Sequence, residues 1–229
     1  SLRAGFVDGP VMIAVADGRN RWSHYRSERL LFCADKGGTR IWKLGFDGVP
    51  EKKITVPKGH QVHYGAVDFY HNLWVTDTEK HRVLKFDHNL HLLDVFGSRG
   101  TDDNQFIEPR GIAIYKRYGQ TFIAERKGAQ YFWMGTRCKS ARLSLAHTEH
   151  PLLMLDLTGF SYVSLFRTSG SDTAYCLSKR MVSPGPSGVA VAACGNAAVR
   201  KGDAFTLRIE PTYSSYTYRH WDIPLTAGR

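Results

Sequence analysis

Histidine is the residue whose number and spacing in this sequence first suggest chemistry. Six of the ten histidines lie between His60 and His91, and imidazole is a common ligand of zinc. His60 and His63 stand just before residues 64–68, which we expect to form an inner strand. If the chain folds into a ring of β-sheets, as the repeat described below indicates, the central channel opens near this strand. We therefore treat His60 and His63 as candidate metal ligands, although two histidines do not complete a zinc site.

Other residue types give weaker indications of chemistry. The acidic turn Asp102–Asn104 offers oxygen ligands for calcium, but a single turn of this kind is more often simply solvated. No GxSxG elbow, HExxH motif, P-loop or paired-carboxylate arrangement occurs. The sequence therefore favours binding over catalysis, and we expect no cofactor, with zinc or calcium as the alternatives.

No two of the four cysteines are spaced as a CxxC pair, which disfavours a cysteine-bound metal. Cys176 and Cys194 lie close enough in sequence to bridge one small β domain in an oxidising compartment. Buried free thiols are an equally good interpretation, and the sequence leaves both open.

A repeat places these residues on a common scaffold. Three segments align without gaps, and each reads as strand, acidic residue, turn and strand: 30–44, 73–86 and 121–134. The acidic residues Asp35, Asp77 and Glu125 are followed five residues later by Arg40, Arg82 and Gln130. Their spacing of 42 and 48 residues is typical of β-propeller blades. We expect Asp35 with Arg40, and Asp77 with Arg82, to form a structural clasp between turn and strand.

The fuller pattern resembles the NHL repeat. Pro109-Arg-Gly-Ile-Ala113 precedes one segment, Leu73-Trp-Val-Thr-Asp77 opens another, and Phe96-Gly-Ser-Arg-Gly100 closes it. The resemblance covers about residues 5–135 and implies an incomplete NHL-type propeller of about three blades. Closed propellers contain about four to eight blades. The missing blades therefore come from a longer chain or from other chains, or a neighbouring domain caps the open ring.

Short strands separated by Ser, Gly and Pro turns replace the repeat from about residue 152, which predicts a β-sandwich. Residues 152–220 resemble the FlgD-type immunoglobulin-like domains of bacterial surface and secreted proteins, which implies a periplasmic or extracellular location. We divide the all-β chain into blades at 1–150 and an immunoglobulin-like sandwich with an aromatic tail at 151–229. Phe205, Leu207 and Ile209 should face its core.

Charge and aromatic content indicate the kind of partner. The chain carries a formal charge of +10, spread along its length, which implies attraction to anionic surfaces. No apolar stretch is long enough to span a bilayer. The tail contains aromatic and basic residues enriched in protein interfaces, and these either bind a partner or pack against the sandwich: Tyr213, Tyr216, Tyr218, Arg219 and Trp221.

These observations predict a non-catalytic scaffold subunit of a larger extracytoplasmic assembly, which binds other protein subunits through propeller loops and the tail. One alternative is a metal-dependent lyase of the peptide-amidating type, whose NHL-like propeller the segment from His63 to Phe86 resembles. Another is an RNA-binding NHL propeller, which requires five arginines to gather on one face: Arg40, Arg82, Arg110, Arg117 and Arg126.

Overall fold

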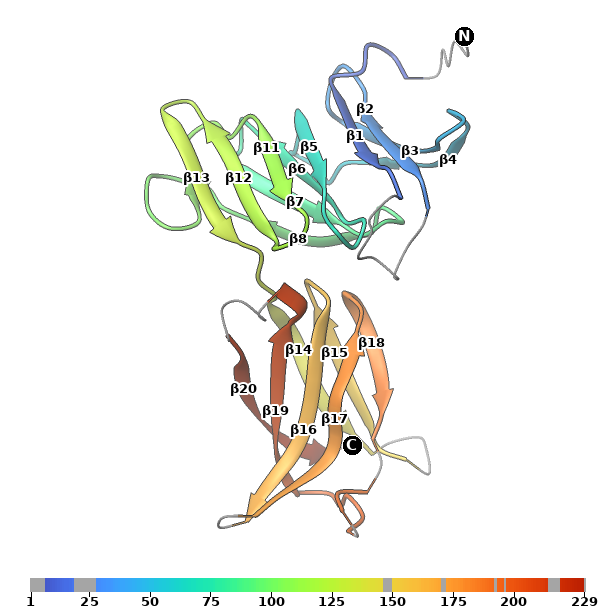
Figure 1. Ribbon diagram of the computed structural model, residues 1–229, viewed down its shortest axis with the longest axis vertical. Coiled ribbons are helices and arrows are strands. Elements are labelled where there is room, and N and C mark those ends of the chain that lie inside the picture. Colours follow the sequence, from blue (N-terminus) through green and yellow to red (C-terminus); the bar gives the residue numbers. More distant parts are fainter. Residues whose placement is uncertain are drawn as a thin grey trace. The chain divides into compact units, whose positions relative to one another are not determined.

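The computed structural model describes residues 7–18, 28–145, 150–169, 172–191, 193–195, 197–213 and 219–228. The chain divides into two compact units, Ser1–Met134 and Gly135–Arg229, and β-strands dominate both (Figure 1). Within the described residues, no helix is long and apolar enough to cross a membrane.

The first unit contains three antiparallel sheets, in which strands that are consecutive in the chain are neighbours. Blade 1 contains β1 (Met12–Ala16), β2 (Leu30–Ala34), β3 (Arg40–Gly45) and β4 (Pro50–Thr55). Blade 2 contains β5 (Tyr64–Val67), β6 (Leu73–Asp77), β7 (Arg82–Phe86) and β8 (Leu92–Phe96). Blade 3 contains β11 (Ile112–Tyr115), β12 (Gln120–Glu125) and β13 (Gly128–Trp133). A short parallel pair, β9 (Ser98–Arg99) and β10 (Gln105–Phe106), lies between blades 2 and 3 in the sequence.

The three sheets are arranged as propeller blades. The innermost strand of blade 2, β5, contacts β1 on one side and β11 on the other, so the first strands of the blades lie side by side (Figure 1). Successive side chains of a strand point to opposite faces of its sheet. Each blade therefore has a backward face, toward the preceding blade, and a forward face, toward the following one. The all-β, incomplete propeller predicted from the repeat is the fold of this unit.

Apolar packing between the faces stabilises the blades. Met12 and Phe32, on the forward face of blade 1, belong to one core cluster with Val67 and Val75 of the backward face of blade 2. A Cβ on Gly65 would lie 2.5 Å from the Met12 Sδ, so blades 1 and 2 approach each other closely at this position.

The second unit is one continuous seven-stranded sheet, in the order β17-β16-β19-β20-β14-β15-β18. Its strands are β14 (Cys138–Ser144), β15 (Leu152–Leu157), β16 (Ser161–Ser169), β17 (Asp172–Val182), β18 (Gly185–Ala190), β19 (Ala204–Pro211) and β20 (Trp221–Gly228). Residues 221–226 of β20 pair with β19, and Ala227 and Gly228 pair in parallel with β14. One strand therefore joins the two halves of the sheet, which encloses a core that includes Leu143, Leu165 and Leu207.

One boundary differs from the sequence prediction. The expected boundary at 150/151 lies instead at 134/135, because β14 pairs with β15 and β20 of the second unit. The second unit is a single sheet whose two halves are joined by β20, and an immunoglobulin-like sandwich stays a prediction. The predicted alternation in β19 is confirmed, since Phe205, Leu207 and Ile209 are at most 4% exposed.

The cysteines divide into one pair and two free thiols. Cys176 and Cys194 form a disulfide, which resolves the alternatives that the sequence left open. Cys33 is free and buried, and Cys138 is free and half-buried.

We expect both free thiols to react slowly with a disulfide reagent at pH 8. Burial raises the pKa of the Cys33 thiol, and burial together with the nearby Asp156 carboxylate raises that of Cys138. Less thiolate, the reactive form, is then present. Ellman's reagent should modify Cys33 more slowly than Cys138, and urea should accelerate both reactions. Native Cys33 reacting as fast as free cysteine would contradict its burial.

Candidate functional site

The acidic residue of blade 1 ties its turn to its next strand. The Asp35 Oδ1 accepts hydrogen bonds from the backbone N–H groups of Thr39 and Arg40, at 2.9 and 3.1 Å. The Arg40 Nε donates to Oδ2 at 2.7 Å. Burial alone would raise the pKa of the Asp35 carboxyl, but these hydrogen bonds lower it below its ordinary value. This ion pair has the geometry expected of a structural clasp.

Blade 2 uses a histidine where an arginine was expected. The Asp77 carboxylate is fully buried and lies 2.8 Å from the His60 Nδ1. It also accepts hydrogen bonds from the backbone N–H groups of Lys80 and Gln61. Among the described residues no ion pair joins Asp77 to Arg82, whose position is exposed. The structure therefore brings together two candidate residues that the sequence had assigned to different roles.

The pairing of His60 bears on the metal hypothesis. Asp77 engages one nitrogen of the His60 ring, and the His63 Nδ1 is buried with no hydrogen-bond partner. In the part of the chain that the structure describes, no three His, Cys, Asp or Glu side chains are placed to share a metal ion. His60 and His63 thus gain no third ligand, and a zinc centre needs at least three.

We expect His60→Ala to lower the free energy of unfolding by about 1–3 kcal/mol, because it removes one partner of the buried Asp77 carboxylate. EDTA should leave the melting temperature of the unmodified protein unchanged. His81→Ala is a suitable comparison, since the His81 Nδ1 accepts a hydrogen bond from the backbone N–H of Glu108. Thermal unfolding with and without EDTA measures both effects, and a fall in melting temperature with EDTA alone would restore the metal hypothesis.

Blade 3 departs from the other two at its hairpin. Glu125 pairs directly with Gly128, whereas Asp77 pairs with Arg82. The blade 3 turn is therefore two residues shorter, and Gln130 is not the counterpart of Arg82 that the gapless alignment predicted. The Glu125 Oε2 instead accepts a hydrogen bond from the Ile107 N–H, and the Gln130 Nε2 donates to the Gln105 carbonyl.

The arginines proposed to bind RNA are largely paired with carboxylates. Arg110 and Arg126 both bind Glu108, at 3.3 and 3.0 Å, and Arg40 binds Asp35. The Arg117 guanidinium lies over the Tyr118 ring. Three of the five positive charges therefore already have an acidic partner within the blades.

The forward face of blade 3 is an exposed apolar surface of the first unit. It is built by alternate residues of three strands and includes Tyr115 on β11, Phe122 on β12, and Tyr131 and Trp133 on β13. Their side chains are 50, 45, 48 and 37% exposed. The Phe122 and Tyr131 rings lie 5.0 Å apart, and those of Tyr131 and Trp133 lie 6.2 Å apart. We call these four residues the aromatic face.

Strand register identifies the counterparts of the aromatic face in the other blades. Phe122 occupies the place of Phe32 and Trp74, which are 0 and 4% exposed. Tyr131, opposite Phe122, occupies the place of Lys43 and Lys85, which are 9 and 4% exposed. The next blade covers these positions in blades 1 and 2. The aromatic face is therefore the surface that a following blade would cover.

The backward face of blade 1 is exposed along its first strand, whereas Cys33 and Leu44 on the same face are buried. Val11, Ile13 and Val15 are 40, 64 and 42% exposed. By register Val15 corresponds to Val67 of blade 2, which is 3% exposed because blade 1 packs against it. We call Val11, Ile13 and Val15 the aliphatic face.

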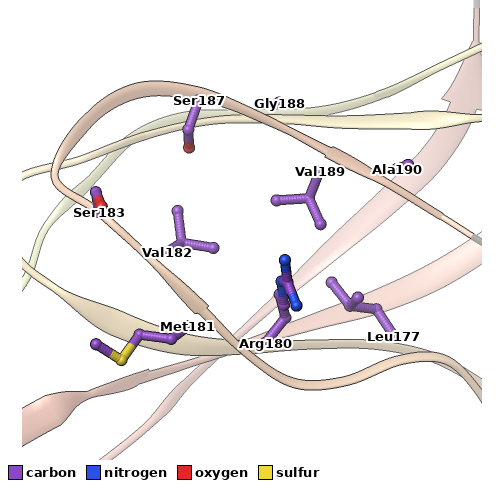
Figure 2. A pocket seen from close by; sticks show the side chains of 9 residues that line it. All are labelled: Leu177, Arg180, Met181, Val182, Ser183, Ser187, Gly188, Val189 and Ala190. Carbon is purple, nitrogen blue, oxygen red and sulfur yellow. The ribbon is translucent and has the colours of Figure 1, made fainter.

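The second unit contains a different kind of surface. A hollow of about 430 Å³ lies where β17 turns into β18, and Figure 2 shows the nine residues that line it, including Arg180, Val182, Ser187 and Val189. The Ser187 Oγ is buried with no hydrogen-bond partner. Among the described residues that line it, none is a histidine, cysteine or carboxylate that could activate that hydroxyl.

The predicted tail site is only partly described. Tyr216 and Tyr218 lie outside the described residues. Tyr213 is half-buried, Arg219 is exposed, and Trp221 is 41% exposed on β20. Trp221 also lines a shallow hollow with Cys138 and Ile209. Partner binding by these residues stays a prediction.

The chain resembles known proteins in sequence over part of its length and in structure at low identity. No protein-family model matches the chain. It is 32% identical to Protein brain tumor of Drosophila melanogaster over 84 residues, which are 37% of this chain and 8% of that protein. The structure is similar to PorZ, a surface component of the type-IX secretion system of Porphyromonas gingivalis, with a TM-score of 0.46, 13% identity and coverage of 94% of this chain and 30% of PorZ.

Another similar structure is virginiamycin B lyase from Staphylococcus aureus, with a TM-score of 0.36 and 12% identity over 94% of this chain and 69% of the lyase. The chain spans less than a tenth of Protein brain tumor and less than a third of PorZ.

Proposed function

We propose that this chain is a non-catalytic binding module of an extracytoplasmic assembly, and that its NHL-type propeller unit binds another protein through the open faces of its end blades. The observation that carries the proposal is the exposure of the aromatic face at positions that are buried in blades 1 and 2. Aromatic side chains bury much apolar area at little cost in conformational entropy, which suits them to protein interfaces.

Further observations support the finer parts of this proposal. The recurring strand pattern and the partial identity with Protein brain tumor, an NHL protein, support the NHL assignment. The Cys176–Cys194 disulfide supports a location outside the cytoplasm, because disulfides persist in oxidising compartments. The His60 Nδ1 lies 2.8 Å from the Asp77 carboxylate, which favours a structural role for His60 over the metal-binding role that the lyase alternative requires.

Photo-crosslinking tests the proposal. A photoreactive phenylalanine analogue replaces Tyr131 in the full chain, which is produced in its native host, and mass spectrometry locates the crosslinked peptide. The matched control places the analogue at Tyr162, which is 40% exposed on β16 of the second unit. We expect position 131 to give defined crosslinks to a β-strand of a propeller blade. No crosslink above the level at position 162 would refute the proposed function.

A further inference from the structure

We propose that the hollow between β17 and β18 binds an extended peptide segment of a partner protein. The segment adds a strand to the free edge of β17 and presents an acidic side chain to Arg180. The hollow is lined by residues of the second unit alone. This inference goes beyond the proposed function, because it concerns a second binding site that uses neither open blade face of the propeller unit.

The first step is that two sheet edges flank the hollow. β17 and β18 stand at opposite ends of the strand order, so β17 pairs only with β16, and β18 pairs only with β15. Within the described residues no hydrogen-bonded ladder joins β17 to β18, although they are consecutive in the chain. An edge strand has unpaired backbone N–H and C=O groups along its free side, and an extended peptide can pair with them.

The second step is that covalent connections join the two edges at both ends of the hollow. At one end the chain passes from β17 to β18 through Ser183 and Pro184. At the other end the disulfide joins Cys176, which directly precedes the lining residue Leu177, to Cys194, which follows β18. These two connections limit how far the edges can separate. A pre-organised site of this kind loses less conformational entropy when a ligand binds.

The third step concerns the charge of Arg180. It pairs with Val163, which is fully buried, and opposite residues of paired strands point to the same face. Arg180 therefore lies on the core-facing side of an edge strand, and Figure 2 shows its guanidinium directed into the hollow. It forms no ion pair with another described residue. An inward-pointing charge disfavours the addition of an apolar strand, so the complementary strand carries a carboxylate.

The other lining residues complete the description of the ligand. Val182 and Val189 offer apolar contacts, and the buried Ser187 Oγ, which has no hydrogen-bond partner, is a further donor. Arg180 and Val182 lie two positions apart on one face of β17, so an added strand places two side chains opposite them with the same spacing. We therefore expect the bound segment to contain an acidic and an apolar residue separated by one position.

Fluorescence anisotropy of synthetic peptides with the purified full chain tests the inference. One labelled peptide, blocked at both ends, has the sequence Thr-Val-Thr-Glu-Thr-Val-Thr, and a second has lysine in place of glutamate. We expect the glutamate peptide to bind about tenfold more tightly, because it gains charge-assisted hydrogen bonds. Arg180→Glu should reverse this order. Arg142→Glu makes the same charge change at an exposed position of β14 and should not. Circular dichroism establishes that each variant is folded.

Two further peptides test the added strand. They are forms of the glutamate peptide with N-methyl groups at odd or at even positions, which removes the N–H groups on one side of the strand or on the other. We expect at least one of them to bind about tenfold more weakly.

Four results would overturn the inference. Unchanged binding of both methylated peptides, or equal competition by acetate, would indicate an anion site without an added strand. An equal loss of glutamate-peptide binding in Arg142→Glu would indicate general attraction to a basic protein. Binding of neither peptide is the result expected if a second copy or another segment of this chain fills the hollow.

Discussion

Asp68→Ala is expected to lower the free energy of unfolding of the first unit by about 3–5 kcal/mol. Asp68 is 1% exposed and directly follows β5, at the turn into β6. Its Oδ1 accepts the backbone N–H groups of Tyr70 and Asn72, both at 2.9 Å. Its Oδ2 accepts the Asn72 Nδ2 at 2.9 Å and the Trp74 Nε1 at 3.0 Å. Alanine leaves these four donors, three of them in buried hydrogen bonds, without that acceptor.

The same change removes a charge that stabilises Lys85. Burial lowers the pKa of the Lys85 ammonium, and the negative charges of Asp68 and Asp94 oppose that effect. Without Asp68 the buried ammonium loses one of these two compensating carboxylates. Removing a carboxylate that compensates a buried charge is among the costlier single changes in a protein.

Asp87→Ala is the matched control for Asp68→Ala. The Asp87 Oδ1 also accepts two backbone N–H groups, from Asn89 and His91, both at 2.8 Å. Asp87 lies nearer to solvent, so water replaces the lost acceptor, and we expect a loss of about 1 kcal/mol. Urea denaturation monitored by tryptophan fluorescence measures both variants. Equal losses would show that the Asp68 network has no special role.

Gly38→Ala is expected to lower the free energy of unfolding by about 3 kcal/mol. A Cβ on Gly38 would lie 2.4 Å from the carbonyl oxygen of Val62 and 2.8 Å from its nitrogen. The Val62 N–H donates to the Gly38 carbonyl at 2.9 Å, so this close approach joins blade 1 to the segment entering blade 2. The φ of Gly38 is +61°, which adds strain for any other residue.

Gly48→Ala is the control for Gly38→Ala, because it has the cost of a positive φ without the cost of steric crowding. Gly48 has a φ of +82°, but a Cβ at this position would meet nothing within 4 Å. We therefore expect only the strain contribution, about 1 kcal/mol. Thermal and urea denaturation of the two alanine variants provide the comparison. A Gly38→Ala loss no larger than that of Gly48→Ala would contradict the close approach of Val62.

Sequence periodicity predicts the blades because each blade is a local unit, formed by strands that are consecutive in the chain. It does not identify His60 as the partner of Asp77, because that contact joins a loop to a turn 17 residues away. Likewise, the sequence predicts that residues 138–144 belong to the propeller. These residues form β14, which pairs with β15 on one side and with β20 on the other. Because β20 is far away in the sequence, local patterns do not indicate that pairing.

The alternation of residues in β12 and β13 indicates the aromatic face, although no sequence motif includes it. Phe122 and Tyr131 alternate with buried Ile123 and half-buried Phe132, so both faces of blade 3 are apolar. Such a pattern is typical of a strand covered on both sides. Only the structure shows that one of those sides is uncovered, because exposure depends on which blades are present and not on the strand itself.

Hydroxyl-radical footprinting of the assembled protein in its native host extract tests most directly whether the aromatic face is an interface. The oxidation rate of Tyr131, which is 48% exposed, is compared with those of Tyr162 and Tyr175, which are 40 and 49% exposed in the second unit. An interface predicts that Tyr131 is oxidised several-fold more slowly than these two residues. Equal rates for all three residues would show that the aromatic face is open to solvent and would contradict a binding role for it.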